Sequence, residues 1–263
     1  MKQTQVCIVG GGCVGLTLAL GLAKANISVV VLDAASTQAP PTDEYGLRVS
    51  ALSIASQTLL EQLNVWPEII AQRSCAYTHM DVRDADSFGK ITFNNKQLEL
   101  DHLGHIVEND IIRFALIKQL EQQSSATLMF DTEYQQIHQS ESDVFITLKS
   151  GEPIIAKLLV AADGANSAIR KQFNMALSFK DYDHHALVAT VKTKEPHANT
   201  ARQVFLPTGP LAFLPLSDDN THSIVWSTSP HHCDELLAMD DTTFNKAVMA
   251  AIDGQCGLCE VQS

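Results

Sequence analysis

Dense runs of basic residues are missing from this sequence of 263 residues, which carries 18 Lys plus Arg against 30 Asp plus Glu for a formal net charge of −12. A nucleic-acid surface needs clustered basic side chains, so we expect no nucleic-acid partner. Apolar runs long enough to cross a bilayer are missing too, and the run at residues 154–162 is both short and interrupted by Lys157. Any membrane contact is therefore expected to be peripheral.

A secretion signal and a disulfide framework are also absent. The apolar residues 6–25 are not followed by a small-residue cleavage pattern, and the six cysteines are scattered along the chain, so we expect a cytoplasmic protein with reduced thiols. Cys256 and Cys259 form a C-x-x-C, which is either a redox or zinc pair or two small residues flanking a strand. The nearby candidates at 231–233 are separated from it by an expected helix, so we favour the second interpretation and expect no metal.

A glycine-rich loop follows the first apolar run. Gly10, Gly12 and Gly15 have the G-x-G-x-x-G spacing between an apolar strand and an apolar helix, and a second strand ends at Asp33. In a Rossmann unit the first glycine allows a sharp turn, the second lets a pyrophosphate approach the backbone, and the third packs the helix against the strand. Phosphates bind at the helix N-terminus, and an acid at the position of Asp33 binds the adenosine ribose. Residues 4–33 therefore predict a dinucleotide-binding β-α-β unit.

The rest of the pattern predicts a mixed chain without internal repeats, long enough for one large domain or two modest ones. Helices are predicted from Ser50 or Ser53 to Leu63, from Trp66, from Glu108 or Asn109 to Gln122, and from Asp241 or Thr242 to Ile252. Strands are predicted at 126–130, 144–149, 154–160, 187–191, 203–206, 211–216, 223–226 and 258–261, with a hairpin in 77–93 that turns at 86–89. The strand-rich last third indicates a second, mostly antiparallel domain.

A second motif follows the strand at 154–160. Residues 159–170, Leu-Val-Ala-Ala-Asp-Gly-Ala-Asn-Ser-Ala-Ile-Arg, resemble the D-G-x-x-S-x-x-R motif of the single-component flavin aromatic hydroxylases. Asp163 can accept hydrogen bonds from a ribose or from ordered water near a pyrophosphate, and Gly164 permits close approach. Ser167 and Arg170 can fix the next helix against the sheet. An ordinary Asp-Gly turn is the alternative, and the upstream glycine loop favours the motif.

Four further segments resemble the ubiquinone-biosynthesis branch of that family, and most closely its members that hydroxylate a 2-polyprenylphenol at ring C5. They are residues 47–52, 102–109, 184–190 and 211–218. The resemblance implies an α/β fold with a Rossmann-like FAD-binding domain of the para-hydroxybenzoate-hydroxylase type and a second, mainly antiparallel β-sheet substrate domain. We assign residues 1–76 and 105–181 to the FAD-binding domain and residues 77–104 and 182–263 to the substrate domain.

The resemblance also implies further cofactor contacts. Arg48 would approach the FAD phosphates or the flavin edge, and Asn109 and Arg113 would meet FAD from the start of their helix. A surface salt bridge for the first and a simple helix cap for the second are the alternatives. No catalytic side chain stands out.

The chemistry implied is that of a monooxygenase. FAD is the expected cofactor and NAD(P)H the transient reductant, because the sequence contains a single G-x-G-x-x-G. Oxygen from O2 would pass through a flavin C4a-hydroperoxide to a polyprenylated phenol in ubiquinone biosynthesis. The second sheet would supply an apolar substrate pocket, with core packing as the alternative for each of its candidate walls: Phe205, Phe213, Leu214, Pro215 and Trp226.

One departure from the family is large, since its members carry a second, Gly-Asp-rich FAD motif beyond residue 263. We therefore expect the N-terminal two-thirds of an enzyme, inactive by itself, with an exposed apolar face and a tendency to self-associate. Contacts with other ubiquinone-biosynthesis proteins and with the periphery of the inner membrane are expected. The open alternatives are a folded fragment, an assembly subunit of a quinone-biosynthesis complex and, less favoured, an NAD-dependent dehydrogenase, which would leave residues 163–170 unexplained.

Overall fold

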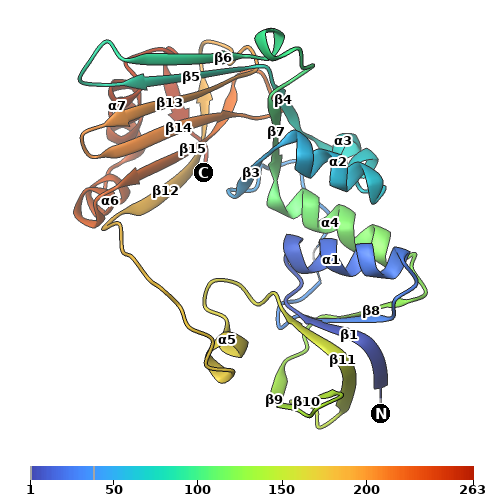
Figure 1. Cartoon of the computed structure of the whole chain (residues 1–263). Coiled ribbons are helices and arrows are strands. Elements are labelled where there is room, and N and C mark those ends of the chain that lie inside the picture. The colour runs from blue at the N-terminus through green and yellow to red at the C-terminus, as the bar shows by residue number, and fades with distance from the viewer. Residues whose placement is uncertain (1, 38) are drawn as a thin grey trace. The chain divides into compact units, whose positions relative to one another are not determined.

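The computed structural model describes residues 2–37 and 39–263 as a mixed α/β chain (Figure 1). It divides into two compact units, each described by itself below: residues 1–41, 59–71 and 110–178, and residues 42–58, 72–109 and 179–263. The bounds of compact units need not coincide with the bounds of domains that are defined by function. The predicted bounds of the FAD-binding and substrate domains therefore stay a prediction.

The first unit is built on a six-stranded sheet in the order β8-β2-β1-β11-β10-β9. Its strands are β1 (Lys2–Val9), β2 (Val29–Leu32), β8 (Ala126–Met129), β9 (Tyr134–Gln139), β10 (Val144–Leu148) and β11 (Pro153–Ala161). Strands β8, β2, β1 and β11 pair in parallel, whereas β9 and β10 pair antiparallel. The carboxyl ends of the parallel strands meet at one edge, which is where ligands bind in open α/β sheets.

The helices that belong wholly or mainly to this unit are α1 (Cys13–Lys24), α3 (Trp66–Gln72), α4 (Asn109–Leu120) and α5 (Ala168–Gln172), and α2 (Ile54–Gln62) is divided between the units. Apolar side chains of β1 and β2 pack against those of β9, β10 and β11 to form one core of this unit. None of the helices in residues 2–37 and 39–263 is long and apolar enough to cross a membrane.

Two glycines let three backbone segments meet at the end of β1. A Cβ atom on Gly15, in the first turn of α1, would lie 2.0 Å from the carbonyl oxygen of Gly10. Gly10 has a φ of +114°, and a Cβ atom there would lie 2.1 Å from the carbonyl oxygen of Ala162, just after β11. Both clashes are with backbone that cannot rotate away, so the approach of α1, β1 and β11 requires glycine at both positions.

The second unit contains a seven-stranded sheet in the order β16-β12-β15-β14-β13-β5-β6. Its strands are β5 (His79–Asp84), β6 (Lys90–Asn94), β12 (His185–Thr193), β13 (Thr200–Leu206), β14 (Gly209–Pro215), β15 (Thr221–Thr228) and β16 (Cys259–Val261). All neighbours are antiparallel except β13 and β5. Helices α6 (Pro230–Leu237) and α7 (Asp241–Ala251) pack on one face and bury its apolar side chains.

A smaller, three-stranded sheet in the same unit has the order β3-β7-β4, with β3 (Val49–Leu52), β4 (Cys75–Tyr77) and β7 (Gly104–Glu108), and a 3-10 helix, η1 (Asn95–Leu98), follows β6. Glu108, at the end of β7, is 4% exposed and accepts hydrogen bonds from Arg73 Nε at 2.7 Å and from the Gly46 N–H at 2.7 Å. The bonded carboxylate raises the pKa of Arg73. Arg73 also donates to the carbonyls of Thr42 and Glu44, so this buried ion pair fixes the loop that precedes β3.

Most predicted elements are confirmed. The β-α-β unit is β1-α1-β2, and the predicted strand at 126–130 is β8, parallel to β2. The hairpin with its turn at 86–89 is formed by β5 and β6, with the Asp84 N–H donating to the Gly89 carbonyl at 3.0 Å.

Two predicted helix starts need correction. Ser50 lies inside β3, because its strand pairs with β7, so Ser53 is the residue that precedes α2 and accepts a bond from the Ser56 N–H. The last helix begins at Asp241, and Asp240 caps it by accepting a bond from the Thr243 N–H at 2.8 Å. The short strands β3 and β7 and the polar strand β9 were not predicted.

A buried histidine makes the second unit sensitive to acid. His222 is fully buried between Phe213 and His197, with its ring 5.4 Å from each of those rings, and burial lowers its pKa to about 3, with smaller contributions from His197 and Arg202. In the unfolded chain, the His222 side chain takes up a proton at the ordinary histidine pKa. In the folded chain, the same side chain stays neutral at that pH.

We expect the free energy of unfolding to fall as the pH drops from about 6.5 toward 3, by about 1.4 kcal/mol per pH unit from this side chain alone, and to be flat in this contribution above that range. Urea titrations across pH should show this slope in the wild type and its loss in His222→Gln. Identical pH profiles for the two proteins would contradict the assignment.

The glycine packing at β1 gives a stability prediction with an internal control. Gly15→Val should lower the free energy of unfolding by at least about 3 kcal/mol, because the new side chain overlaps backbone. Gly21 lies in the same helix, and a Cβ atom there would meet nothing within 4 Å. Gly21→Ala should therefore raise the free energy of unfolding by about 0.5 to 1 kcal/mol. Chemical denaturation of both variants checks this, and equal effects would refute it.

Candidate dinucleotide site

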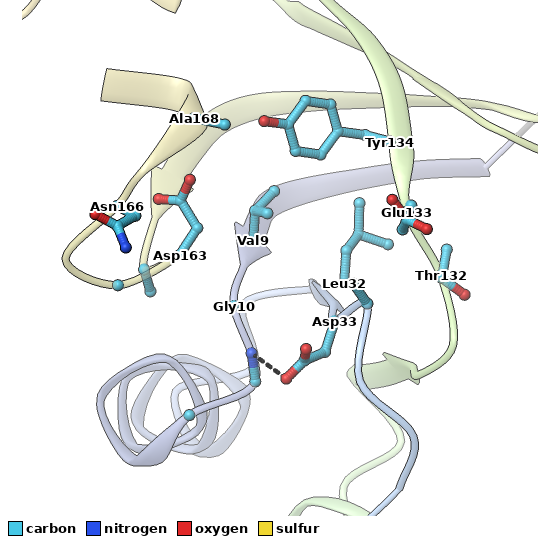
Figure 2. A pocket seen from close by; sticks show the side chains of 15 residues that line it. Val9, Gly10, Leu32, Asp33, Thr132, Glu133, Tyr134, Asp163, Asn166 and Ala168 are labelled. Carbon is cyan, nitrogen blue, oxygen red and sulfur yellow. Dashed lines mark hydrogen bonds between the residues drawn. The ribbon is translucent and has the colours of Figure 1, made fainter. Parts of the chain in front are cut away.

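A pocket of about 610 Å³ opens at the carboxyl edge of the parallel strands in the first unit (Figure 2). Its walls come from the ends of β1, β2 and β11 and from the segment that joins β8 to β9. The residues that line it are Val9, Gly10, Gly11, Gly12, Leu32, Asp33, Ala34, Thr132, Glu133, Tyr134, Ala162, Asp163, Gly164, Asn166 and Ala168. The two sequence motifs, 150 residues apart, therefore meet at one pocket.

The glycine loop presents the start of α1 to this pocket. Gly12 is the N-cap residue of α1, in an extended conformation and without a side-chain cap. A Cβ atom on Gly12 would meet nothing within 4 Å, unlike one on Gly10 or Gly15. The space beside Gly12 is thus open at the positive end of a helix, the arrangement that binds phosphate groups.

Asp33 is held in place by the loop that it faces. Its Oδ2 atom accepts a hydrogen bond from the Gly11 N–H at 2.8 Å, drawn as the dashed line in Figure 2, and its Oδ1 atom accepts one from the Ala35 N–H at 3.0 Å. These bonds fix the rotamer and leave further lone pairs of the carboxylate available. The side chain can therefore accept bonds from ligand hydroxyl groups without reorganisation.

Arg113 contacts the same loop through hydrogen bonds and charge. Its Nε atom donates to the Gly11 carbonyl at 2.8 Å, its Nη2 atom lies 3.7 Å from Asp33 Oδ2, and its guanidinium lies 5.2 Å from the centroid of the Phe130 ring. A second hollow of about 530 Å³ lies between the guanidinium, Gly12 and Ser36. The structure thus gives Arg113 a bracing role, and its predicted contact with FAD stays a prediction.

Asp163 lines the pocket, and one oxygen of its carboxylate has no hydrogen-bond donor among the described residues. Its Oδ2 atom accepts a bond from the Ile169 N–H at 3.3 Å, while its Oδ1 atom is buried and has no hydrogen-bond partner in the part of the chain that the structure describes. Ser167 caps α5 by accepting from the Arg170 N–H, and Arg170 donates to the Ala165 carbonyl at 2.7 Å. The motif therefore builds a rigid loop around an acceptor that needs a donor from a ligand or water.

Sequence reasoning missed the wall formed by Thr132, Glu133 and Tyr134. Burial raises the pKa of Tyr134, and the nearby charge of Asp163 adds to the rise. Its ring forms a partly apolar wall of the pocket, with the hydroxyl directed toward Ala168 (Figure 2). No local signal marked it, because the strand that it begins, β9, is mostly polar.

Two predicted cofactor residues, Arg48 and Asn109, lie in the second unit. The Asn109 N–H donates to the Arg48 carbonyl at 2.9 Å, and Asn109 Oδ1 accepts a bond from Ser50 Oγ at 2.6 Å. The Arg48 side chain is exposed. Their contacts with FAD stay a prediction.

The predicted substrate walls are divided between the two faces of the seven-stranded sheet. Phe213 and Trp226 belong to the core under α6 and α7, and Pro215 is buried on the same face two residues further along β14. Phe205 and Leu214 alternate with core residues and therefore point to the opposite face, where Phe205 is 47% exposed. Packing accounts for the first three residues, and which of the five contact a substrate stays a prediction.

The cysteine pair lies at the start of a strand. Cys259 begins β16, both Cys256 and Cys259 are buried, and burial raises the pKa of Cys259 to about 12. Over the described ranges 2–37 and 39–263, no group of three or more His, Cys, Asp or Glu side chains is arranged to hold a metal ion.

Comparison with known proteins agrees with this geometry. A family model described as an FAD binding domain matches residues 3–261. The ubiquinone biosynthesis monooxygenase COQ6 of Danio rerio is 38% identical over 263 residues, covering 94% of this chain and 54% of the relative. The 3-demethoxyubiquinol 3-hydroxylase of Escherichia coli is 35% identical, covering 91% and 61%. PqsL, a probable FAD-dependent monooxygenase from Pseudomonas aeruginosa, has the same fold, with a TM-score of 0.79 at 18% identity over 100% of this chain and 73% of that one.

The chain spans a little over half the length of these curated relatives. The family model nevertheless covers nearly the whole chain, and residues of both the glycine loop and the D-G motif line the pocket described above. The chain therefore belongs to the FAD binding domain family, alongside flavin-dependent monooxygenases of ubiquinone biosynthesis.

Proposed function

We propose that this chain holds the ADP half of FAD at the pocket of the first unit and serves the hydroxylation of a polyprenylated phenol ring in ubiquinone biosynthesis. The observation that carries the proposal is the meeting of an open phosphate site at Gly12 with the unpartnered carboxylate oxygen of Asp163 in one pocket. Ring position C5 and the use of NADH or NADPH as reductant belong to the same proposal.

The residues present fit the ADP half of this cofactor. Gly12 and the start of α1 would take the pyrophosphate, because no side chain fills the space there. Asp33 would accept a bond from a ribose hydroxyl, since the Gly11 and Ala35 N–H groups already orient it. Asp163 would accept a second bond through Oδ1, which removes the cost of an unmet buried acceptor.

When bound and reduced, FAD supplies the activation of O2 and the transfer of one oxygen atom to an electron-rich ring. The protein binds and orients the reactants and excludes water from the reacting atoms. In the second unit, Phe205 and Leu214 offer apolar surface on the sheet face opposite α6 and α7. A polyprenyl tail suits such a surface, because each buried CH2 contributes about 0.8 kcal/mol to binding.

An NAD-dependent dehydrogenase is the second candidate, because it would use the same glycine loop and Asp33. It gives no role to Asp163, whose loop is braced by Ser167 and Arg170 to hold an open acceptor. The flavin proposal accounts for both motifs and is therefore preferred. The visible spectrum of a full-length version separates the two, because bound flavin absorbs near 450 nm and NAD does not.

Gly12→Val should abolish dinucleotide binding while leaving stability nearly unchanged. The branched side chain would occupy the space for the pyrophosphate, and its Cβ atom would meet no heavy atom within 4 Å beyond the adjoining residues. FAD and ADP titrations by calorimetry, together with thermal unfolding, measure the two effects. FAD affinity like that of the wild type would overturn the site, and Gly21→Ala serves as the control that should bind normally.

The activity itself predicts a product one oxygen atom heavier than the substrate. We expect a full-length version of the enzyme that carries this chain, supplied with FAD, NADH or NADPH, and a 2-polyprenylphenol, to form a C5-hydroxylated product detectable by mass spectrometry, with 18O incorporated from 18O2. Substrates with shorter tails should have higher KM values. Tight FAD binding without any hydroxylated product would leave the cofactor site standing and refute the substrate proposal.

A further inference from the structure

The seven-stranded sheet ends in an edge strand with exposed side chains. β6 (Lys90–Asn94) is the last strand of its sheet, beyond β5 in Figure 1, and within residues 2–37 and 39–263 it pairs with β5 alone. Edge strands are normally protected by proline, by a bulge, by shortness or by charged side chains, especially lysine. β6 has no proline, its register with β5 is continuous over the whole strand, and its only charged residue, Lys90, forms an ion pair with Asp81 of β5 at 3.1 Å.

The hydrogen-bonding groups that face the free edge follow from the register. The Asp84 N–H donates to the Gly89 carbonyl and the Asn95 N–H donates to the Thr78 carbonyl, so Gly89 and Asn95 face β5. Because directions alternate along an antiparallel ladder, the residues between them at 91 and 93 also face β5. The N–H and carbonyl groups of Lys90 and Thr92 and the N–H of Asn94 therefore point outward, whereas the Asn94 carbonyl belongs to the first turn of η1, which Asn94 caps.

The sequence of this edge is complementary to itself. In an antiparallel pair centred on Thr92, that residue faces its own copy, Lys90 faces Asn94, and Ile91 faces Phe93. No like charges face each other, and Thr92 both donates to and accepts from its own copy, while the Asn94 N–H donates to the Lys90 carbonyl of the other copy. The side chains of Ile91 and Phe93, now 59% and 45% exposed, become apolar cross-strand pairs on one face.

We propose that β6 pairs antiparallel with β6 of a second copy of this chain, with Thr92 on the two-fold axis, to form one continuous sheet. The contact is isologous, so it closes at a dimer and does not extend into a filament. A strand edge this short buries less area than a permanent interface, so the dimer should dissociate in the micromolar range. This inference is independent of the proposed cofactor and substrate.

Sedimentation equilibrium from low micromolar to several hundred micromolar chain tests the proposal. The mean mass should rise from 28.7 kDa toward twice that value with concentration. Thr92→Pro should hold the chain at the monomer mass, because it removes an N–H that β5 does not use. Thr92→Ser keeps that N–H and should associate like the wild type.

Charged substitutions of Thr92, the residue on the proposed two-fold axis, test the register of the β6–β6 pair. Thr92→Lys and Thr92→Glu should each be monomeric, because each places like charges directly opposite one another, and an equimolar mixture should recover the dimer. If Thr92→Pro fails to fold, the charged variants still test whether β6 forms the dimer contact. Phe179→Ser, at an exposed apolar residue outside β6, should associate like the wild type. A wild type that stays monomeric, a mixture that stays monomeric, or a dimer lost in Phe179→Ser but kept in Thr92→Pro would overturn the proposal.

Discussion

The close approach of three backbone segments at the end of β1 is the constraint on which the candidate site depends. Gly15 of α1 rests on the carbonyl of Gly10, and Gly10 rests on the carbonyl of Ala162. Because no Cβ atom fits at either contact, the start of α1 and the end of β11 are drawn to the same strand end. That places the phosphate-binding end of a helix beside the D-G loop. Packing therefore determines where the two motifs meet, and Gly12, which makes no such contact, is left open for a ligand.

The polar groups around the pocket divide into those that the protein satisfies and one that it does not. Asp33 is oriented by backbone N–H groups, and Arg113 braces the carbonyl of Gly11. Ser167 and Arg170 complete the hydrogen bonds of the D-G loop, yet Asp163 Oδ1 keeps an unmet bond. A buried acceptor without a donor costs stability, and a rigid surrounding loop prevents it from relaxing. The cost is recovered only when a ligand or water donates to it, which is typical of a preorganised binding site.

The glycine loop and Asp33 could be predicted because each rests on local rules of backbone conformation and spacing, and the D-G motif could be predicted from its resemblance to a family motif. Strand β7 could not, because its buried Glu108 is explained by partners far away in the sequence, Arg73 and the Gly46 N–H. β9 was missed for a similar reason, since its polar residues form a strand through pairing with β10 and not through an apolar pattern. The five residues predicted to line a substrate pocket lie on both faces of one sheet. Hydrophobicity identifies the strands that are buried, but it does not show which helices or loops cover each face.

The covering of the seven-stranded sheet determines what its residues can contact. Helices α6 and α7 bury one face, so Phe213 and Trp226 stabilise the unit and are closed to any ligand that leaves the helices in place. Phe205 on the other face and the outward backbone groups of β6 at the edge keep access to other molecules. The two accessible regions offer different chemistry, since the face presents apolar side chains and the edge presents hydrogen-bonding backbone. The proposed hydrocarbon tail would use the first and the proposed partner strand the second, so the two proposed contacts would not compete for the same atoms.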